Sequence, residues 1–221
     1  MNVRLTLTVL GTLLLVFLIA CGAWGLSDLA SRHSFDVRAD YPGVRALDVD
    51  GGDGDVRIIA APAGSSAVTV DERVTEGLTS PHSDAVLAAG GVLHLSASCS
   101  FVFSNSCGAR YTIAVPPGVA IDAHSGGGDV DAQGISDLNV TLESGDGDVT
   151  ATLDRAPMRL KASSGNGNVT LTVPDETYAV HASSGNGNVS DQTLRTDPRS
   201  PRSITASSGN GDVTIQAAGS G

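Results

Sequence analysis

The sequence predicts an all-β protein, a single-chain β-solenoid (β-helix) with rungs of about 20 residues. Three observations lead to this fold class. A glycine-rich phrase occurs six times, apolar and polar residues alternate on both sides of it, and no window has the period of a soluble amphipathic helix. An apolar segment at the N-terminus precedes the solenoid and predicts an anchor helix or a lipoprotein signal.

Each copy of the phrase ends in a valine: Val56, Val130, Val149, Val169, Val189 and Val213. After the first gap these valines are 19, 20, 20 and 24 residues apart. A nearly fixed period of this length is typical of a solenoid in which each rung stacks on the previous one. Glycines stand four and two positions before every valine: Gly52, Gly54, Gly126, Gly128, Gly145, Gly147, Gly165, Gly167, Gly185, Gly187, Gly209 and Gly211.

The residue directly before each valine is Asp or Asn, so the phrase reads Gly-x-Gly-Asx and predicts a tight turn. Glycine adopts positive φ without a steric clash, and Asn and Asp tolerate the left-handed region better than other residues. Their short side chains also accept hydrogen bonds from nearby N–H groups. We therefore assign these glycines a structural role in turns.

The residues that flank the turn predict strands. Residues 169–173, Val-Thr-Leu-Thr-Val, alternate apolar and polar side chains after the turn, and residues 178–182 form the returning strand. Seven positions before the valine, small or apolar residues should face the core: Ala123, Leu142, Ala162, Ala182 and Ala206. The polar columns beside them should face solvent.

The rung that ends in Val189 departs from this pattern. Asp191 and Thr193 stand where other rungs have inward apolar residues, and the segment from Arg195 to Arg202 is polar and contains proline. We predict that this segment is a loop that bulges from one face, where insertions into repeats normally lie, and that it accounts for the 24-residue step. The tail after Gln216 is too short to cap the stack, so open strand edges are expected there.

The chain divides into three predicted parts. They are a membrane anchor or lipoprotein signal at 1–26, a polar tether at 27–43, and the β-solenoid domain at 44–221, which is less regular over 44–122 than over 123–221.

The run from Leu5 to Leu26 is almost wholly apolar and follows Arg4. It is long enough to cross a hydrocarbon core of about 30 Å, and it also has the form of an export signal. Leu18-Ile19-Ala20-Cys21 resembles a bacterial lipobox, which makes Cys21 a candidate for lipidation. The alternative is a retained transmembrane helix with Trp24 at the outer interface. Both alternatives place the solenoid on the extracytoplasmic face of the bacterial cell membrane.

The other two cysteines, Cys99 and Cys107, flank a short segment in the less regular region. In an exported chain such a pair predicts a disulfide, and the alternative is two free thiols. Phe101 and Phe103 lie between them and would either pack within this lobe or form a contact patch.

Composition limits the function classes. With 13 Lys and Arg against 24 Asp and Glu, the net charge is −11, so nucleic acid is not an expected partner. Aromatic residues make up 4% of the chain, so the core must consist of stacked Val, Ala, Leu and Ile layers. The sequence contains no Gly-x-Ser-x-Gly elbow, phosphate-binding loop or His-Glu-x-x-His motif, and we predict that the protein is not an enzyme.

One pair of residues is a candidate metal site. Stacked rungs bring Asp129 and Asp148 within about 4.8 Å, and a calcium ion with oxygen ligands would relieve their repulsion. Asn168 and Asn188 continue the column as neutral amides. We therefore expect a hydrogen-bonded turn ladder without a metal and no cofactor, and calcium binding is the alternative.

One charged cluster is the candidate for catalysis. Asp122, Glu143 and Lys161 fall in outward columns of neighbouring rungs, as do the catalytic carboxylates and basic residues of β-helices that cleave polysaccharides. Such clusters are common on charged surfaces. His124 and His181 are not adjacent in rung order and are expected to be ordinary exposed residues.

The apolar anchor, the repeated Ser-Gly-[Asn/Asp]-Gly-[Asn/Asp]-Val phrase and the segment from Cys107 to Pro116 together resemble the bacterial "putative adhesin" family of unknown function, which is related to the head-GIN domains. The resemblance covers roughly residues 44–219. It implies a surface-exposed β-helix and transfers no catalytic residue.

We therefore expect a non-enzymatic cell-surface β-solenoid that acts as an adhesin-like, envelope-interaction or sensing module. Its partners would be the membrane, through the N-terminus, and an unknown surface protein or envelope glycan. Two alternatives stay open: a carbohydrate-active β-helix enzyme, and a structural exoplasmic domain that partners another membrane protein.

Overall fold

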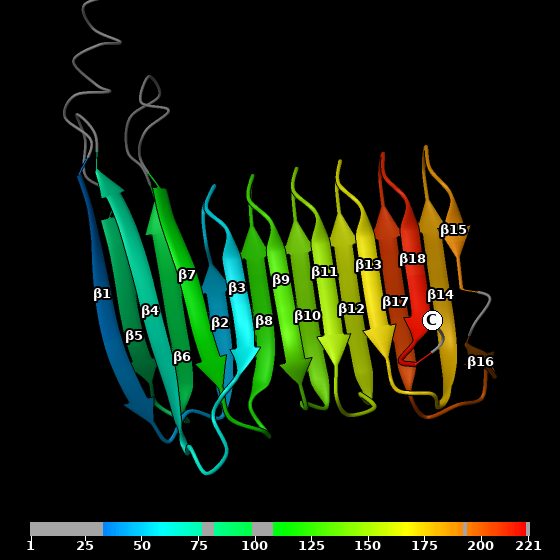
Figure 1. The fold of residues 1–221 in the computed structure, drawn as a ribbon, viewed down its shortest axis with the longest axis horizontal. Coiled ribbons are helices and arrows are strands. Elements are labelled where there is room, and N and C mark those ends of the chain that lie inside the picture. Colours follow the sequence, from blue (N-terminus) through cyan, green and yellow to red (C-terminus); the bar gives the residue numbers. More distant parts are fainter. Residues whose placement is uncertain (1–32, 77–81, 99–107, 192–193, 220–221) are drawn as a thin grey trace, which may run out of the picture.

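A computed structural model describes residues 33–76, 82–98, 108–191 and 194–219. Within these ranges the chain forms 18 strands and no helix, and the strands make two nine-stranded sheets that face each other in a flattened solenoid (Figure 1). The predicted all-β class and solenoid architecture are confirmed. The predicted N-terminal anchor lies outside the described residues.

The two sheets, sheet A and sheet B, run along the same stack. From one end to the other, sheet A contains β1 (His33–Pro42), β4 (Ala67–Glu76), β7 (Gly108–Val115), β3 (Val56–Ala60), β9 (Val130–Ile135), β11 (Val149–Leu153), β13 (Val169–Val173), β18 (Val213–Ala217) and β15 (Val189–Ser190). In the same direction, sheet B contains β5 (His82–Ala88), β6 (Val92–Ser98), β2 (Ala46–Asp50), β8 (Ala120–Ser125), β10 (Asn139–Ser144), β12 (Arg159–Ser164), β17 (Ser203–Ser208), β14 (Thr177–Ser184) and β16 (Arg195–Thr196).

The core is a stack of small apolar layers, as the alternation predicts. Neighbouring rungs pair in parallel and in register, so that Val149 lies beside Val169 and Leu142 beside Ala162. Because every second residue of a strand points inward, equivalent residues form continuous buried columns. The valine column is fully buried except at Val189, which lies at the end of the stack and is 43% exposed.

The order of rungs in space differs from their order in the chain, and this corrects the prediction that each rung stacks on the previous one. The last rung, β17–β18, lies between the β12–β13 rung and the β14–β15 rung. The physical reason is visible in the strands. Val213 and Ile215 of β18 are buried, whereas β15 is a two-residue strand that ends before Asp191. The weaker rung occupies the end because no further rung has to pack on it.

The segment from Arg195 to Arg202 therefore has a different role from the predicted bulge. It connects the terminal rung to the inserted one, and its first residues form β16, which pairs with Thr177 and Tyr178 of β14. The predicted open end after Gln216 is likewise wrong, because β18 is an interior strand.

The N-terminal end of the stack is also not in chain order. The β2–β3 rung lies between the β8–β9 rung and the strands β6 and β7, while β4 and β5 pair antiparallel with β7 and β6. Residues 33–42, which the sequence places in the tether, form β1 and pair antiparallel with β4. The physical reason is that β1 alternates inward Phe35, Val37 and Ala39 with charged residues, a strand pattern within a segment that looks polar overall.

The glycine turns follow one edge of the solenoid, the upper edge in Figure 1. Among the repeat glycines only Gly52 has a positive φ, 58°. The predicted conformational reason is therefore wrong for the others, and close contact between rungs replaces it. A Cβ on Gly147, for example, would lie 2.5 Å from the carbonyl carbon of Gly128 and 2.8 Å from the nitrogen of Asp129.

Buried serines join the turns of neighbouring rungs. Ser164 Oγ donates a hydrogen bond to the carbonyl oxygen of Gly147 at 2.7 Å, and it accepts one from the nitrogen of Gly167 in its own turn at 2.8 Å. The same two bonds occur at Ser125, Ser144 and Ser208. The serine thus satisfies two backbone groups that the turn would otherwise bury without partners.

Candidate functional site: a charged hollow on sheet A

The outer face of sheet A carries its densest set of charged side chains on β1, β4 and β7. In β4 the residues Val68, Val70 and Val74 point inward and are buried, so Asp71 and Arg73 between them point outward. Asp36 and Arg38 of β1 lie opposite Arg73 and Asp71. On the other side of β4, Arg110 and Thr112 of β7 lie opposite the same two residues.

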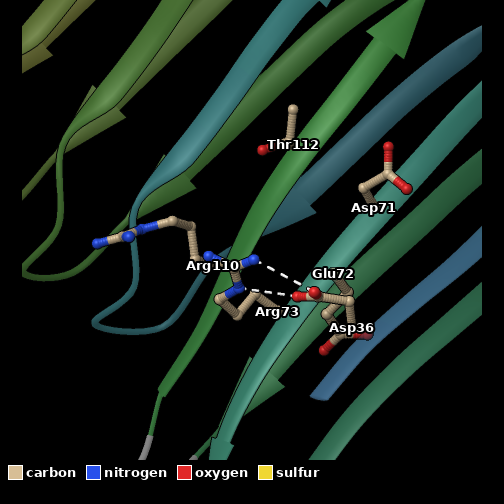
Figure 2. Close-up of a pocket in the computed structure, with 6 residues that line it drawn as sticks. All are labelled: Asp36, Asp71, Glu72, Arg73, Arg110 and Thr112. Carbon is tan, nitrogen blue, oxygen red and sulfur yellow. Dashed lines mark hydrogen bonds and ion pairs between the residues drawn. The ribbon is translucent and has the colours of Figure 1, made fainter. Parts of the chain in front are cut away.

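Ion pairs fix these side chains. Arg73 donates from Nε to Asp36 Oδ1 at 2.8 Å and from Nη2 to Asp36 Oδ2 at 3.2 Å, as the dashed lines in Figure 2 show. Arg110 donates from Nε to Asp55 Oδ2 at 2.9 Å. Arg38 and Asp71 form a looser pair at 3.6 Å. The hydrogen bond from Arg73 lowers the pKa of Asp36 below its usual value, and Asp36 raises the pKa of Arg73.

Two arginines face each other directly across β4 and β7, at Arg73 and Arg110. Like charges in this position destabilise a sheet. Each guanidinium is compensated by a carboxylate on its far side, Asp36 for Arg73 and Asp55 for Arg110. In Figure 2 the Arg110 side chain accordingly extends away from the hollow, while that of Arg73 turns towards Asp36.

These side chains surround an open hollow of about 300 Å³, which we call the charged hollow. Its lining residues are Asp36, Asp71, Glu72, Arg73, Arg110 and Thr112. The Asp36 and Asp71 carboxylates and the Arg73 guanidinium lie on this face, so the hollow offers both hydrogen-bond acceptors and donors. That set is suited to hydrogen bonding with a polar ligand that carries several hydroxyl groups.

Glu72 differs from the other lining residues in the direction of its side chain. It stands between the outward Asp71 and Arg73 in β4, so it points to the inner face, where it lies opposite the buried Tyr111. Burial raises the pKa of the Tyr111 hydroxyl, and the negative charge of Glu72 raises it further. The Glu72 carboxylate therefore lies on the inner face of the sheet, next to the apolar core.

The calcium candidates Asp129 and Asp148 are neighbours in the turn ladder. The backbone nitrogen of Asp148 donates to Asp129 Oδ1 at 2.8 Å, and that of Asn168 donates to Asp148 Oδ1 at 2.7 Å. Each Asx oxygen thus binds the next turn, which is the arrangement of a hydrogen-bonded ladder. Among the residues that the structure describes, no three His, Cys, Asp or Glu side chains come together as metal ligands. Calcium binding stays an untested alternative to the ladder.

The outer face of sheet B brings together the candidate catalytic residues. Lys161 Nζ lies 2.5 Å from Glu143 Oε1. The pKa of Asp122 is raised, chiefly by partial burial and then by the charges of Asp48 and Glu143. His124 lies beside Glu143 on the adjacent strand, whereas His181 belongs to the terminal rung and is not part of this group.

Cys21, Cys99 and Cys107 lie outside the described residues. The lipidation of Cys21 and the disulfide between the other two stay predictions. No helix in the described part of the chain is long and apolar enough to cross a membrane.

The charged hollow was not predicted from the sequence. Its residues are far apart in the chain, at positions 36, 71–73 and 110–112, and antiparallel pairing of β1, β4 and β7 brings them together. The alternation in Ala67–Glu76, Ala-Val-Thr-Val-Asp-Glu-Arg-Val-Thr-Glu, does predict a strand with a charged outer face. Nothing in one sequence indicates which strand lies beside it.

Three solved structures of bacterial proteins align with this chain. A "putative cell adhesion protein" from Clostridium sporogenes aligns with a TM-score of 0.59 and 14% sequence identity, over 84% of this chain and 100% of that chain. A "putative adhesin" from Bacteroides fragilis aligns at 15% identity with a TM-score of 0.32, over 83% of this chain and 97% of that one. Another from Parabacteroides distasonis aligns at 12% identity with a TM-score of 0.34, over 84% and 97%.

The first of these similarities supports the fold alone. No curated protein matches the chain. Residues 115–220, which include the regular rungs, match the family model described as Toastrack DUF4097. The resemblance seen in the sequence is confirmed by this match to the Toastrack DUF4097 model over residues 115–220.

Proposed function

We propose that the protein is a non-enzymatic, adhesin-like module of the bacterial cell surface that binds envelope glycans through the charged hollow. The observation that carries the proposal is the composition of this hollow, in which the ion pair between Asp36 and Arg73 and the Asp71 carboxylate lie beside an open volume of about 300 Å³. Several hydroxyl groups on one sugar match such a set of paired donors and acceptors.

The ion pairs favour binding over catalysis at this position. A general acid or base works best with a pKa near the ambient pH. Arg73 instead lowers the pKa of Asp36 and holds it as a permanent acceptor. The hollow offers no aromatic platform, so a single site would bind weakly, and many copies on one surface would supply the avidity. The description of similar folds as adhesins agrees with this role.

The proposal is tested by binding of the purified full chain, in detergent, to envelope glycan fragments, with calorimetry as the readout. Arg73→Ala removes two hydrogen-bond donors at the hollow and leaves the inner face of β4 unchanged. Because a hydrogen bond to a charged group contributes about 1.5–3 kcal/mol, we expect binding to weaken about tenfold or more. Arg199→Ala, on the exposed connection after β16, is the matched control. Equal affinities for the two variants would refute binding at the charged hollow.

The alternative of a carbohydrate-active enzyme has one supporting observation, the raised pKa of Asp122 beside Glu143 and Lys161. A carboxylic acid with a raised pKa is what a glycosidase uses to protonate a leaving group. Incubation of the full chain with a panel of polysaccharides decides between the two proposals. Product release that disappears in Asp122→Asn supports the enzyme, whereas saturable binding without turnover supports the adhesin-like module.

A structural exoplasmic domain with a membrane-protein partner is the remaining alternative. Cross-linking in living cells separates it from the adhesin-like module, because it captures the partner without assuming a chemistry. A single membrane protein in all cross-linked products would favour this alternative.

A further inference from the structure

We propose that two copies of this chain pair edge to edge through β1, in antiparallel register centred on Val37, and that this contact joins two opposing cell surfaces. The pairing itself is independent of ligand binding in the charged hollow. Only the statement that it joins two surfaces rests on the proposed adhesin-like function and its membrane anchor.

The two ends of the stack are built differently. At the C-terminal end, β15 has only two residues, and β16 pairs with two of the eight residues of β14. Short and covered edges are the usual protection against unwanted strand pairing. At the N-terminal end, the edge strands β1 and β5 are long and, among the described residues, no strand pairs with their outer edges.

The N-terminal end also exposes apolar side chains that belong to the inner face. Phe35, Val37 and Leu87 are 44%, 45% and 43% exposed. The apolar residues beside them on the next strand are buried. Val74 of β4 lies beside Phe35, and Leu93 of β6 lies beside Leu87. A sheet that continued past β1 would cover these side chains in the same way. In the described part of the chain no strand covers them, and continuation of the sheet would do so.

The sequence of β1 is complementary to itself in one antiparallel register. When Val37 lies opposite Val37 of a second copy, Phe35 lies opposite Ala39, and Asp36 lies opposite Arg38, once on each side of the two-fold axis. A register centred on Asp36 would oppose two aspartates, and one centred on Arg38 would oppose two arginines. A register centred on Ala39 also pairs Arg38 with an aspartate, but it leaves Phe35 uncovered.

The same register continues the charge pattern of the outer face. Within one chain, Asp36 pairs with Arg73 and Arg38 pairs with Asp71. Across the contact, one row of side chains runs through both copies. It contains Arg73 and Asp36 of the first copy, followed by Arg38 and Asp71 of the second copy. Charges of opposite sign alternate along this whole row, so Asp36 of each copy gains a second arginine. Electrostatic complementarity of this kind selects one partner and one register.

Antiparallel pairing fixes the direction of the two chains. β1 begins at the edge that carries the glycine turns (Figure 1) and runs to the opposite edge. His33 of the second copy therefore lies at the opposite edge of the pair. A ten-residue strand spans about 33 Å, whereas the six tether residues between 27 and 32 reach at most about 21 Å. With anchors at residues 1–26 and the strands upright on the membrane, the two copies cannot share one membrane in this contact, but copies on facing membranes can.

Matched substitutions at the two ends test the pairing. Val37→Lys places a charge on an inner-face position that is 45% exposed at the N-terminal end, and Val189→Lys does the same at a 43% exposed position at the C-terminal end. The full chain is examined in detergent by sedimentation equilibrium, with thermal unfolding as the check of folding. We expect the wild type and Val189→Lys to dimerise with similar affinity and Val37→Lys to be at least tenfold weaker. A monomeric wild type, or equal dimerisation of the two folded variants, would overturn the proposal.

Charge reversal tests the register. In a pair of two Asp36→Lys copies, the new lysine lies opposite Arg38. In a pair of two Arg38→Glu copies, the new glutamate lies opposite Asp36. Each variant alone should therefore be monomeric. A mixture of the two should form a heterodimer, because both charge pairs are then of opposite sign. Failure of the mixture to associate, while the wild type does, would overturn the register centred on Val37.

Vesicles test whether the contact joins two surfaces. The Asp36→Lys and Arg38→Glu chains are reconstituted separately into phosphatidylcholine vesicles, and light scattering reports clustering. We expect clustering only when the two vesicle populations are mixed. Dimers in detergent without clustering would overturn the opposing arrangement alone. Since Val37 faces away from the charged hollow, glycan binding by Val37→Lys reports on the proposed function separately.

Discussion

Gly147 provides a direct test of why the turns contain glycine. If positive φ were the reason, Gly147→Ala would cost roughly 1–2 kcal/mol, and Gly147→Asn would cost less, because Asn tolerates the left-handed region. The structure gives Gly147 no positive φ. A Cβ at this position would instead lie 2.5 Å from the carbonyl carbon of Gly128, which belongs to the backbone of the neighbouring rung and cannot rotate away.

The size of the effect follows from this contact. The backbones of two stacked turns must separate by about an ångström to admit the methyl group, while flanking strands hold them in register. Overpacking in a rigid environment typically costs about 1–3 kcal/mol and more where nothing yields, so we expect about 3 kcal/mol for Gly147→Ala. For a chain of this size such a loss lowers the melting temperature by about 6–12 °C.

Gly127 is the matched control, since it lies in the same turn family, has no positive φ, and would place a Cβ 3.5 Å from the Asp53 side chain, an ordinary contact. We expect Gly127→Ala to be neutral or to stabilise the chain by up to about 1 kcal/mol. The assay is urea unfolding followed by circular dichroism on the full chain in detergent. The reasoning is refuted if Gly147→Ala and Gly127→Ala differ by less than about 1 kcal/mol, or if Gly147→Asn is more stable than Gly147→Ala.

Three further predictions concern other parts of the chain. Ser164→Ala removes the partner of two turn groups and should destabilise the chain by about 1–3 kcal/mol, whereas the outward Ser163→Ala should change little; equal urea midpoints would contradict the ladder. Burial raises the pKa of Tyr178 to about 12, so its contribution to stability is present below about pH 10 and is lost as the pH rises towards 12. Tyr178→Phe should therefore lose less stability between pH 9 and 11.5 than the wild type, and identical slopes would argue against this assignment. Mass spectrometry of the native N-terminus separates the two anchors, because an intact segment from Met1 to Ala20 is incompatible with lipidation of Cys21.

The regular part of the fold could be predicted because it is periodic. Valine, glycine and Asx columns repeat at a fixed spacing, so aligning the copies gives the turns, the inward faces and the outward columns that the structure contains. The serine column was visible as well, but its role as a bond between rungs depends on the backbone of a neighbouring turn. The same holds for the glycines, whose crowding comes from the adjacent rung rather than from their own conformation.

The order of the rungs could not be predicted from the phrase, because the relevant copies are almost identical. Residues 162–169 and 182–189 have the same sequence, Ala-Ser-Ser-Gly-Asn-Gly-Asn-Val, so either fits beside the last rung. What decides the order is the apolar content beyond the phrase. Ile215 lies on the inner face of the last rung, whereas Asp191 follows directly after the shortened strand of the terminal one.

The charged hollow and the exposed N-terminal end depend on pairings between segments that share no repeat. Phe35 and Val37 lie in a segment whose polar residues suggest a tether, yet every second residue is apolar and faces the core. Period-two alternation over a short, charged segment was the available signal. Its pairing with β4, which follows only after two other strands in the chain, has no local signature.

The inserted rung constrains how this protein can be made and how it can change. A chain that emerges N-terminus first exposes β14 and β15 before β17 and β18 exist, and the identical phrase lets the earlier pair dock provisionally on β12 and β13. If the earlier pair does dock there, the late pair has to displace it, and the final step of maturation is then an exchange of neighbours rather than the addition of one more layer. For the same reason, repeats added after residue 217 would not lengthen the stack. Growth by duplication has to occur inside the gene segment that encodes the regular rungs, with the terminal rung kept as a fixed stop.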